Sequence, residues 1–270
     1  MFRGVQPPIQ LSGFRMRLVH AIAGVACLSL AAVAYAQSTA IAAPEAPPVQ
    51  AAPLVEAPAH WGDAKAGQAK AAICAACHGL DGNAMQQNAP RIAGMPERYI
   101  ADQLQLFKSG QRTSGLAAVM MPFASTLNAQ DMRNVGAWFA SQKPGAGIAD
   151  DSVIASGPNK GLKFYQVGER MFRGGDAARG IPACMACHGP SGSGNPGPAY
   201  PALHGQSADY VTRRLEEYRT GTTTYANHAH FDLMASVAKT LTDEEIHSLA
   251  SYVQGLHART AEPAAAASAP

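Results

Sequence analysis

The sequence predicts an all-α protein that is built from two copies of one helical domain. Apolar residues recur at helical spacing in several segments, for example at Ile100, Leu104 and Phe107, and no stretch keeps up the alternation that a half-buried strand requires. The pentapeptide Cys-x-x-Cys-His occurs twice, 110 residues apart, at residues 74–78 and 184–188. The spacing around the two pentapeptides is also repeated, which indicates a tandem duplication.

The repeat extends well beyond the pentapeptides. Pro90 lies 12 residues after His78, and Pro201 lies 13 residues after His188. A tyrosine, a leucine and a glycine follow each proline at the same distances in both copies, and a leucine opens the last helical pattern of each copy. The matched pairs are Tyr99 with Tyr210, Leu104 with Leu215, Gly110 with Gly221, Leu127 with Leu241, and Trp138 with Tyr252.

Each predicted helix has a recognisable start. One helix runs from near Asp63 into the first pentapeptide, a second begins near Glu97, and a third follows Asn128, a favourable N-cap residue. In the second copy, Thr242 and Glu245 have the spacing of a capping box at the start of the last helix. The last predicted helix of each copy has an apolar face. This face consists of Met132, Val135 and Phe139 in the first copy, and of Ile246, Leu249, Val253 and Leu256 in the second.

Composition divides the chain into segments. Stretches rich in alanine and proline indicate a disordered tether and a disordered tail, and a Pro-Gly-Ala-Gly run marks a linker between the copies. The expected segments are a signal peptide (1–36), the tether (37–60), the first domain (61–143), the linker (144–157), the second domain (158–258) and the tail (259–270).

The N-terminus has the parts of a secretory signal peptide. Three arginines precede an apolar run over residues 18–34, and the run ends in the small-residue pattern Ala-Tyr-Ala. We therefore expect cleavage before Gln37 and export to the periplasm. A retained membrane anchor is the main alternative, although the run is shorter than the ~20 apolar residues of a spanning helix. Lipid attachment at Cys27 is a second alternative.

The repeated pentapeptide is the attachment pattern of covalent haem c. Two thiols bind one haem, and the histidine after the second cysteine ligates the iron. A zinc half-site would need further cysteines or histidines at matching spacing, and a thioredoxin-like dithiol would sit in a βαβ unit. We therefore expect two haems c on one chain. The thioether residues are Cys74, Cys77, Cys184 and Cys187, and the proximal ligands are His78 and His188.

The sixth iron ligand decides between an electron carrier and a catalyst. Met120 and Met234 each lie seven residues before the leucine that opens the last helical pattern, so the repeat selects them as thioether ligands in loops before the last helices. Methionine ligation raises the reduction potential. The rivals are Met121 at the first haem, and His228 or His230 at the second.

Pro90 and Pro201 are candidates for a supporting role, because a ligating histidine usually donates its second ring N–H to a carbonyl or a carboxylate. The alternative is that both prolines are only turn residues.

Charge gives little support for nucleic-acid binding, since the formal net charge is only +2. Residues 61–143 carry eight basic and five acidic side chains, whereas residues 158–258 carry nine of each. This asymmetry can steer the encounter with a partner protein, or it is scatter in the surface charge.

The chain resembles the di-haem cytochrome c4 family over residues 61–258. The resemblance rests on Gly-Asp-Ala-Lys-Ala-Gly-Gln before the first haem motif, on the residues around both motifs, on Glu97-Arg98-Tyr99 and on Tyr-Val-Gln-Gly-Leu-His at 252–257. It implies two class I cytochrome c domains related by an approximate two-fold axis, His–Met iron ligation, haem propionate edges that face each other, and proline carbonyl bonds to the proximal histidines. It also implies helix-crossing contacts between Gly67 and Trp138 and between Gly168 and Tyr252.

We therefore expect a periplasmic one-electron carrier, a monomer and not an enzyme. The family resemblance implies a quinol-oxidising complex as electron donor and a haem–copper oxidase as acceptor, and it leaves association with membrane complexes open. The rival interpretations are a di-haem peroxidase or sulfur-compound dehydrogenase, and a fixed electron-transfer subunit of a larger complex.

Overall fold

The structure is a computed structural model that describes residues 61–86, 88–221 and 229–257. The expected signal peptide, tether and tail lie outside these residues. Within them every regular element is helical, and no β-strand occurs apart from isolated bridges. This confirms the all-α prediction. None of the helices in the described ranges is long and apolar enough to cross a membrane.

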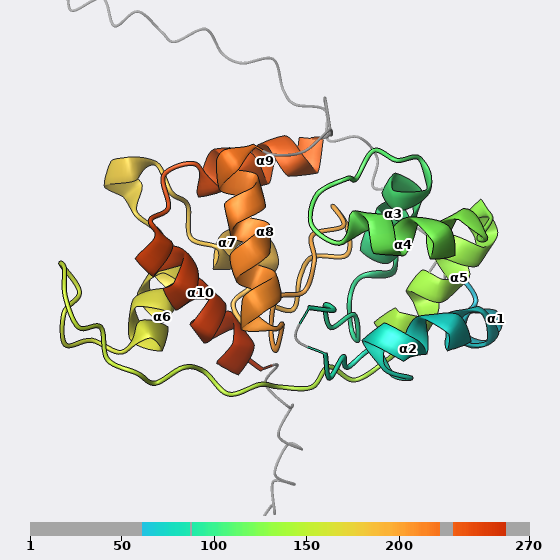
Figure 1. Ribbon diagram of the computed structural model, residues 1–270, viewed down its shortest axis with the longest axis horizontal. Helices are drawn as coiled ribbons and strands as arrows, with labels where there is room; N and C mark the ends of the chain where they lie inside the picture. Colours follow the sequence, from blue (N-terminus) through green and yellow to red (C-terminus); the bar gives the residue numbers. More distant parts are fainter. Residues whose placement is uncertain (1–60, 87, 222–228, 258–270) are drawn as a thin grey trace, which may run out of the picture. The chain divides into compact units, whose positions relative to one another are not determined.

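The two halves of the described chain have the same order of elements (Figure 1). The first half contains α1 (Ala64–Ala71), the 3-10 turn η1 (Ala72–Cys74), α2 (Ala75–His78), α3 (Glu97–Lys108), α4 (Ala117–Ser125) and α5 (Ala129–Ala140). The second half contains α6 (Phe164–Gly174), η2 (Ala177–Arg179), α7 (Met185–His188), α8 (Ala208–Thr220), α9 (Ala229–Ala238) and α10 (Asp243–Gly255).

A glycine allows the first and last helices of each half to cross closely. Helix α1 packs against α5, and α6 packs against α10. A Cβ atom on Gly67 would lie 1.9 Å from the carbonyl oxygen of Asn134, and one on Gly168 would lie 2.0 Å from that of Ser248 and 2.7 Å from the Cβ of Tyr252. In the first half, Gly67 therefore lies closest to Asn134, which is one helical turn before Trp138, the residue expected at this contact.

Side-chain caps fix the starts of these helices. The Asp63 carboxylate accepts hydrogen bonds from the backbone N–H groups of Lys65 and Ala66, at 2.8 and 3.1 Å. Asn128 and Asp131 form a reciprocal capping box at the start of α5. The expected capping box of Thr242 at the start of α10 is also present. Such caps satisfy backbone N–H groups that have no partner within the helix.

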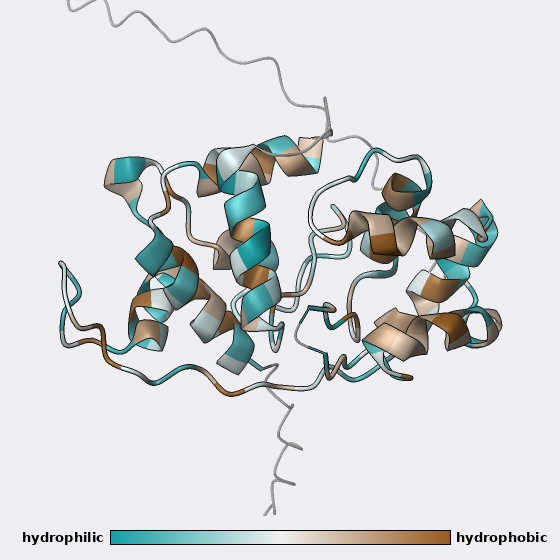
Figure 2. Cartoon of the chain, in the orientation of Figure 1, coloured by the Kyte–Doolittle hydropathy of each residue, from teal (hydrophilic) through white to brown (hydrophobic). Residues whose placement is uncertain are grey.

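Each half has its own apolar core, in which the last helix packs against a helix that flanks the haem motif (Figure 2). In the first half, Leu104 from α3 packs in one cluster with Val135 and Phe139 from α5. In the second half, Phe172 from α6 packs with Ile246 and Leu249 from α10. Phe139 and Phe172 are almost completely buried. These cores hold in place the helices that flank the haem motifs.

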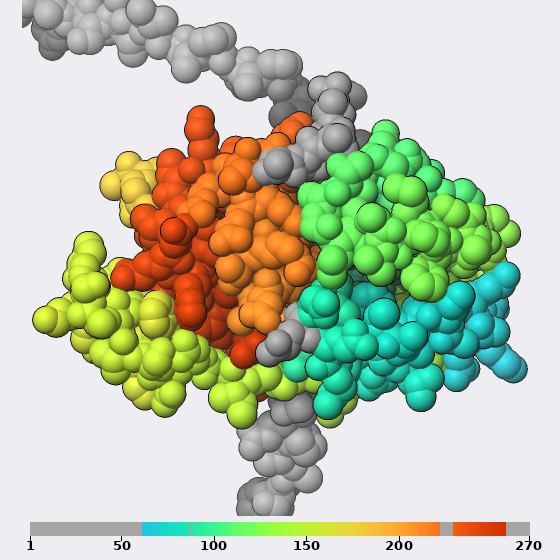
Figure 3. Space-filling model, viewed as in Figure 1, coloured from blue at the N-terminus to red at the C-terminus, as the bar shows by residue number. Residues whose placement is uncertain are grey.

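The segments that carry the candidate methionine ligands are helical, which corrects our expectation of loops. Met120 lies in α4 and Met234 lies in α9. Helix α4 contains Pro122 in its interior, a residue that normally ends a helix. The alanines and methionines before Pro122 favour helix, and contacts of α4 with α3 support it. The segment of α4 lies at the surface in the view of Figure 3.

The segment expected as a linker, residues 144–157, lies alongside α10. The backbone N–H of Gly147 donates to the carbonyl of Gln254 at 3.0 Å, and that of Asp150 donates to the Ser251 hydroxyl at 2.9 Å. These bonds attach the segment to the second half of the chain. The domain limits themselves stay a prediction.

Candidate haem c sites

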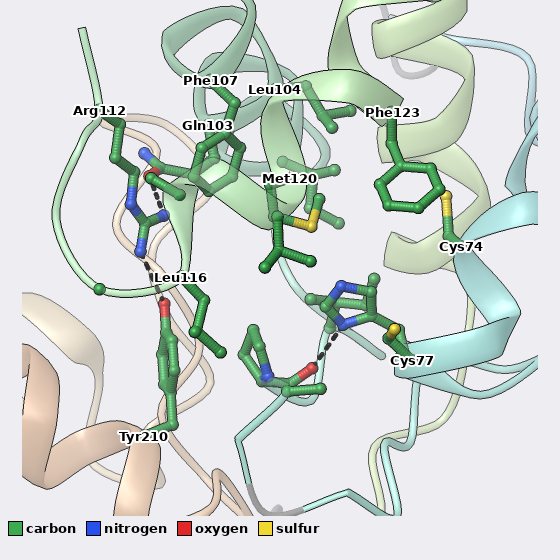
Figure 4. Close-up of a pocket in the computed structure, with 18 of the residues that line it drawn as sticks. Cys74, Cys77, Gln103, Leu104, Phe107, Arg112, Leu116, Met120, Phe123 and Tyr210 are labelled. Atoms are coloured by element: carbon green, nitrogen blue, oxygen red, sulfur yellow. Dashed lines mark hydrogen bonds between the residues drawn. The ribbon is translucent and has the colours of Figure 1, made fainter. Parts of the chain in front are cut away.

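The first Cys-x-x-Cys-His motif opens into a cavity of about 310 Å³ (Figure 4). Cys74, Cys77 and His78 lie on one part of its wall, and Met120 lies on another. The remaining wall is mostly apolar and comes from loop residues 86 and 88–95, from α3, α4 and α5, and from a few residues of α8. Among the described residues, no group of three or more His, Cys, Asp or Glu side chains could hold a bare metal ion. Because its wall is mostly apolar, the cavity is suited to a larger, mainly apolar group.

A proline carbonyl orients the histidine of each motif. The Nδ1 atom of His78 lies 2.8 Å from the carbonyl oxygen of Pro90, and that of His188 lies 2.9 Å from the carbonyl oxygen of Pro201. Because a carbonyl only accepts, Nδ1 carries the proton and Nε2 keeps its lone pair. Burial lowers the pKa of both imidazoles, and the carbonyl bonds oppose this shift. Both rings thus have the neutral form that ligates a metal.

The motif cysteines are buried to different extents. Burial raises the pKa of the Cys74 thiol above its ordinary value, and it raises that of Cys184 to about 11. This raised pKa sets both thiols apart from the low-pKa thiolate of a dithiol oxidoreductase. Cys187 is exposed, and Cys77 is half-buried.

The two neighbouring methionines of α4 differ in position. Met120 is half-buried and belongs to the wall of the first cavity, and Figure 4 shows it on the same wall as Phe123. Met121 is 37% exposed and is absent from the residues that line that cavity. The geometry thus favours the methionine that the repeat selects.

The second cavity, of about 190 Å³, offers two donor side chains on one helix. His230 and Met234 both line it and lie one turn apart on α9. The His230 ring packs edge-on against Tyr200, with 5.6 Å between the ring centroids. The other rival ligand, His228, lies outside the described residues. Met234 therefore has a second candidate iron ligand, His230, beside it on the same helix. The first copy has no histidine at the position that matches His230.

Four residues line both cavities, namely Met95, Tyr99, Gln103 and Tyr210. Tyr99 and Tyr210 come from matching positions of the repeat. The pKa of Tyr99 is raised well above its ordinary value, chiefly by burial. Burial also raises the pKa of Tyr210, but the guanidinium groups of Arg112 and Arg214 outweigh it and lower the value. The wall shared by the cavities is therefore polar and aromatic.

Two buried arginines connect the halves of the chain at this wall. Arg112 donates to the Gln103 amide oxygen at 2.7 Å and to the Tyr210 hydroxyl at 3.4 Å, as Figure 4 shows. Arg214 pairs with Glu217 and also donates to the Ser114 hydroxyl at 3.3 Å. No pattern in the sequence indicates that either arginine is buried at this wall. Neither has an arginine at the matching position of the other copy, so the repeat carried no signal for them.

The residues present fit haem c. Each cavity is bounded by paired thiols, by an imidazole whose Nε2 is left for the iron, and by a thioether sulfur on another helix. Its wall is otherwise mainly apolar, which suits the porphyrin ring.

Known proteins have the same organisation. The family model for cytochrome c matches residues 64–143 and 174–257. Cytochrome c4 of Pseudomonas aeruginosa is 43% identical over 196 residues, which cover 73% of this chain and 90% of that protein. The thiosulfate dehydrogenase electron acceptor of Thiomonas intermedia is 36% identical, with 79% of this chain and 89% of that protein covered.

A solved structure extends the likeness to the fold. The crystal structure of reduced recombinant cytochrome c4 from Pseudomonas stutzeri aligns with a TM-score of 0.63 and 39% identity, and the match covers 73% of this chain and all of that one. The chain therefore belongs to the di-haem cytochrome c4 family of electron carriers, and its two Cys-x-x-Cys-His motifs bind two covalent haems c.

Proposed function

We propose that the protein is an exported one-electron carrier in which one histidine and one methionine ligate each iron. The proposed pairs are His78 with Met120 and His188 with Met234. Bound haem c supplies an iron that changes between Fe(II) and Fe(III). The thioether bonds to the haems are assigned to Cys74, Cys77, Cys184 and Cys187.

The observation that carries this proposal is the matched pair of cavities. In each, a proline carbonyl holds the histidine ring by its Nδ1–H, and a methionine from a separate helix lines the same space. The carbonyl bond fixes the ring orientation before the iron binds, which keeps the ligand geometry similar in both oxidation states. It also leaves Nε2 as the only ring nitrogen with a lone pair for the iron. The thioether favours Fe(II), because it is a soft ligand.

The same arrangement supports a carrier more than an enzyme. A methionine at the sixth position leaves no open site for peroxide or for a sulfur substrate. The apolar lining also keeps water away from the iron. We therefore propose that no substrate bond is made or broken at either haem.

The proposed partners follow from relatives. Family resemblance favours a quinol-oxidising complex as donor and a haem–copper oxidase as acceptor, with the carrier in the periplasm. A second candidate donor is a thiosulfate dehydrogenase, because a 36% identical relative is named as the electron acceptor of such an enzyme. The two donors differ in chemistry, so they can be tested separately.

An optical redox titration of the purified holoprotein tests the carrier proposal. We expect the weak far-red band of methionine-ligated ferric haem at both sites, and no binding of carbon monoxide by the ferrous protein. Carbon monoxide binding at one haem of the wild type would contradict the carrier reading. Reduction by thiosulfate plus purified thiosulfate dehydrogenase, compared with reduction by quinol plus a quinol-oxidising complex, identifies the donor.

A further inference from the structure

A glutamine of the second half holds the loop that carries Pro90 in the first half. The Gln206 side chain is almost completely buried and lines the second cavity. Its amide reaches across 115 positions of the chain to the backbone of Arg91, which lines the first cavity. The Arg91 N–H donates to Oε1 of Gln206 at 2.9 Å, and Nε2 of Gln206 donates to the Arg91 carbonyl at 2.8 Å. One side chain therefore connects the walls of both cavities.

The orientation of this amide is fixed by its partners. Two backbone N–H groups donate to Oε1, that of Arg91 and that of Ser207, the latter at 3.0 Å. A carbonyl oxygen accepts from Nε2 on the other side. Exchanging the oxygen and the nitrogen of the amide would place donors against donors, so the assignment follows from the contacts. The Arg91 guanidinium adds a third bond between the halves, because its Nη1 donates to the carbonyl of Gly205 at 2.7 Å.

The bond to Gln206 acts on the peptide group that orients His78. The N–H of Arg91 and the carbonyl of Pro90 belong to one peptide unit, and this carbonyl accepts the Nδ1–H of His78 at 2.8 Å. The hydrogen bonds therefore form a chain from Gln206 through this peptide unit to the imidazole. Hydrogen bonds in such a chain polarise one another, so an acceptor at the N–H makes the carbonyl a stronger acceptor. A stronger bond at Nδ1 makes the imidazole a more basic ligand through Nε2.

The second copy provides an internal control, because it binds the same cofactor. Met95 occupies the position that matches Gln206, and Ala202 occupies the position that matches Arg91. Met95 and Ala202 belong to one apolar cluster, and a thioether is a weak acceptor that donates no hydrogen bond. The carbonyl bond to the second histidine is nevertheless present. Orienting the ring therefore does not require the amide, and the copies differ in how strongly the carbonyl accepts.

We propose that Gln206 is a positioning residue for the first haem, although it belongs to the second copy. By accepting from the Arg91 N–H, it strengthens the bond between Pro90 and His78. The stronger bond stabilises Fe(III) and lowers the reduction potential of the first haem relative to the second. Hydrogen bonds around an axial ligand are one of the means by which a protein sets this potential. The inference rests on the proposed ligation of the first iron by His78 and adds the residue that tunes it.

The test replaces the amide with a side chain of similar length that cannot form both hydrogen bonds. In Gln206→Met, the reduction potential of the first haem should rise, and that of the second, whose cavity Gln206 itself lines, should stay unchanged. We expect the electron equilibrium between the haems to shift about twofold toward a reduced first haem, which is about 18 mV at about 59 mV per tenfold change. A redox titration followed by NMR gives both potentials, since contacts with Phe123 and Phe172 assign the haem methyl signals to the first and second cavities.

Hydrogen exchange provides a second readout, which does not depend on electron transfer. The Nδ1–H of His78 should exchange with solvent faster in Gln206→Met than in the wild type, and that of His188 should be unchanged. In the wild type, the Nδ1–H of His78 should exchange more slowly than that of His188, because both rings are buried to a similar extent and only the first carbonyl is polarised by an amide. This comparison needs no variant, so it decides the question even if Gln206→Met does not fold.

Two control variants separate the bond to Arg91 from a general effect of contacts between the halves. Gln206→Glu keeps an acceptor for the Arg91 N–H, so it should leave the first potential unchanged or lower it. Ser114→Ala removes the bond that Arg214 donates at 3.3 Å, which is another contact between the halves, and it should leave both potentials unchanged. Intact mass must show two covalent haems in each variant that is titrated.

Several results would overturn the proposal alone. They are an unchanged first potential in Gln206→Met, a larger shift at the second haem than at the first, or an equal rise in Gln206→Glu or Ser114→Ala. Exchange at His188 that is as slow as at His78 in the wild type would also contradict it. A failure of the proposed function has a different signature. If the ferric wild type shows no hyperfine-shifted Nδ1–H signal from His78, this histidine does not ligate the iron.

Discussion

The crossing of α6 and α10 allows a quantitative prediction, because it depends on the absence of a single carbon atom. A Cβ atom at position 168 would lie 2.0 Å from the carbonyl oxygen of Ser248 and 2.6 Å from its carbonyl carbon. Both are backbone atoms of α10, so no side-chain rotation can relieve the clash. In the variant Gly168→Ala the two helices must separate by roughly 1.3 Å to restore an ordinary carbon–oxygen contact of about 3.3 Å.

That separation disturbs a well-packed core. Phe172 and Ile246, which lie one turn or less from the crossing on the same two helices, are almost completely buried. Forcing an additional methyl group into a tight core typically costs about 1–3 kcal/mol. The gain in helix propensity from glycine to alanine returns only about 1 kcal/mol, and the clash with backbone atoms places this site at the upper end of the range. We expect a net loss of about 2 kcal/mol in the free energy of unfolding.

A second glycine in the same helix is the matched control. A Cβ atom on Gly174, the last residue of α6, would meet nothing within 4 Å. Gly174→Ala should therefore be neutral, or stabilise by up to about 1 kcal/mol. Urea unfolding of the holoprotein, followed by circular dichroism, gives the midpoint and the slope for each variant. An unchanged midpoint for Gly168→Ala would refute the close crossing, and equal losses in both variants would refute the role assigned to Ser248.

Three further predictions concern the cofactor, its ligands and pH. The exported protein should exceed its cleaved polypeptide by two haem masses, and haem that acid acetone extracts would contradict covalent attachment. Met120→Ala and Met234→Ala should each lower the reduction potential of one haem and open its iron to carbon monoxide. Met121→Ala should leave the haem spectrum intact. If Met121→Ala instead changes the first haem and Met120→Ala does not, the ligand on α4 was assigned wrongly. The backbone N–H of Asn128 holds the pKa of the Asp131 carboxyl below its ordinary value of 3.8. The stabilisation by the ionised Asp131 carboxylate is complete above that value and is lost as the pH falls through the lower pKa of the folded state. The difference in unfolding free energy between wild type and Asp131→Ala should therefore shrink below about pH 4. A difference that persists at about pH 2 would contradict this.

The parts of the site that the sequence could predict are those encoded over short distances. The haem motif needs only five consecutive residues, and the caps at Asn128 and Thr242 need only the residue three positions later. The bond between His78 and Pro90 spans 12 residues, but the second copy repeats it with His188 and Pro201. Duplication therefore made a tertiary contact visible in the sequence.

The parts that could not be predicted depend on how distant segments meet. Arg112 reaches Tyr210 across 98 positions, and Arg214 reaches Ser114 across 100. No local pattern indicates that these guanidinium groups are buried. Helix α4 was missed for a different reason, since Pro122 argues for a break. The packing of α4 against α3 supports the continuation of the helix through this proline.

The comparison of the two copies also separates what the cofactor requires from what this chain requires. Features present in both copies, such as the proline carbonyl bond and the methionine one helix before the end, are those that we assign to haem binding. Features found in one copy need another cause. The exposed Val119 and Leu116 beside the first cavity, against His230 packed on Tyr200 beside the second, are of this kind. Because both copies bind the same group, these differences are not required by the haem.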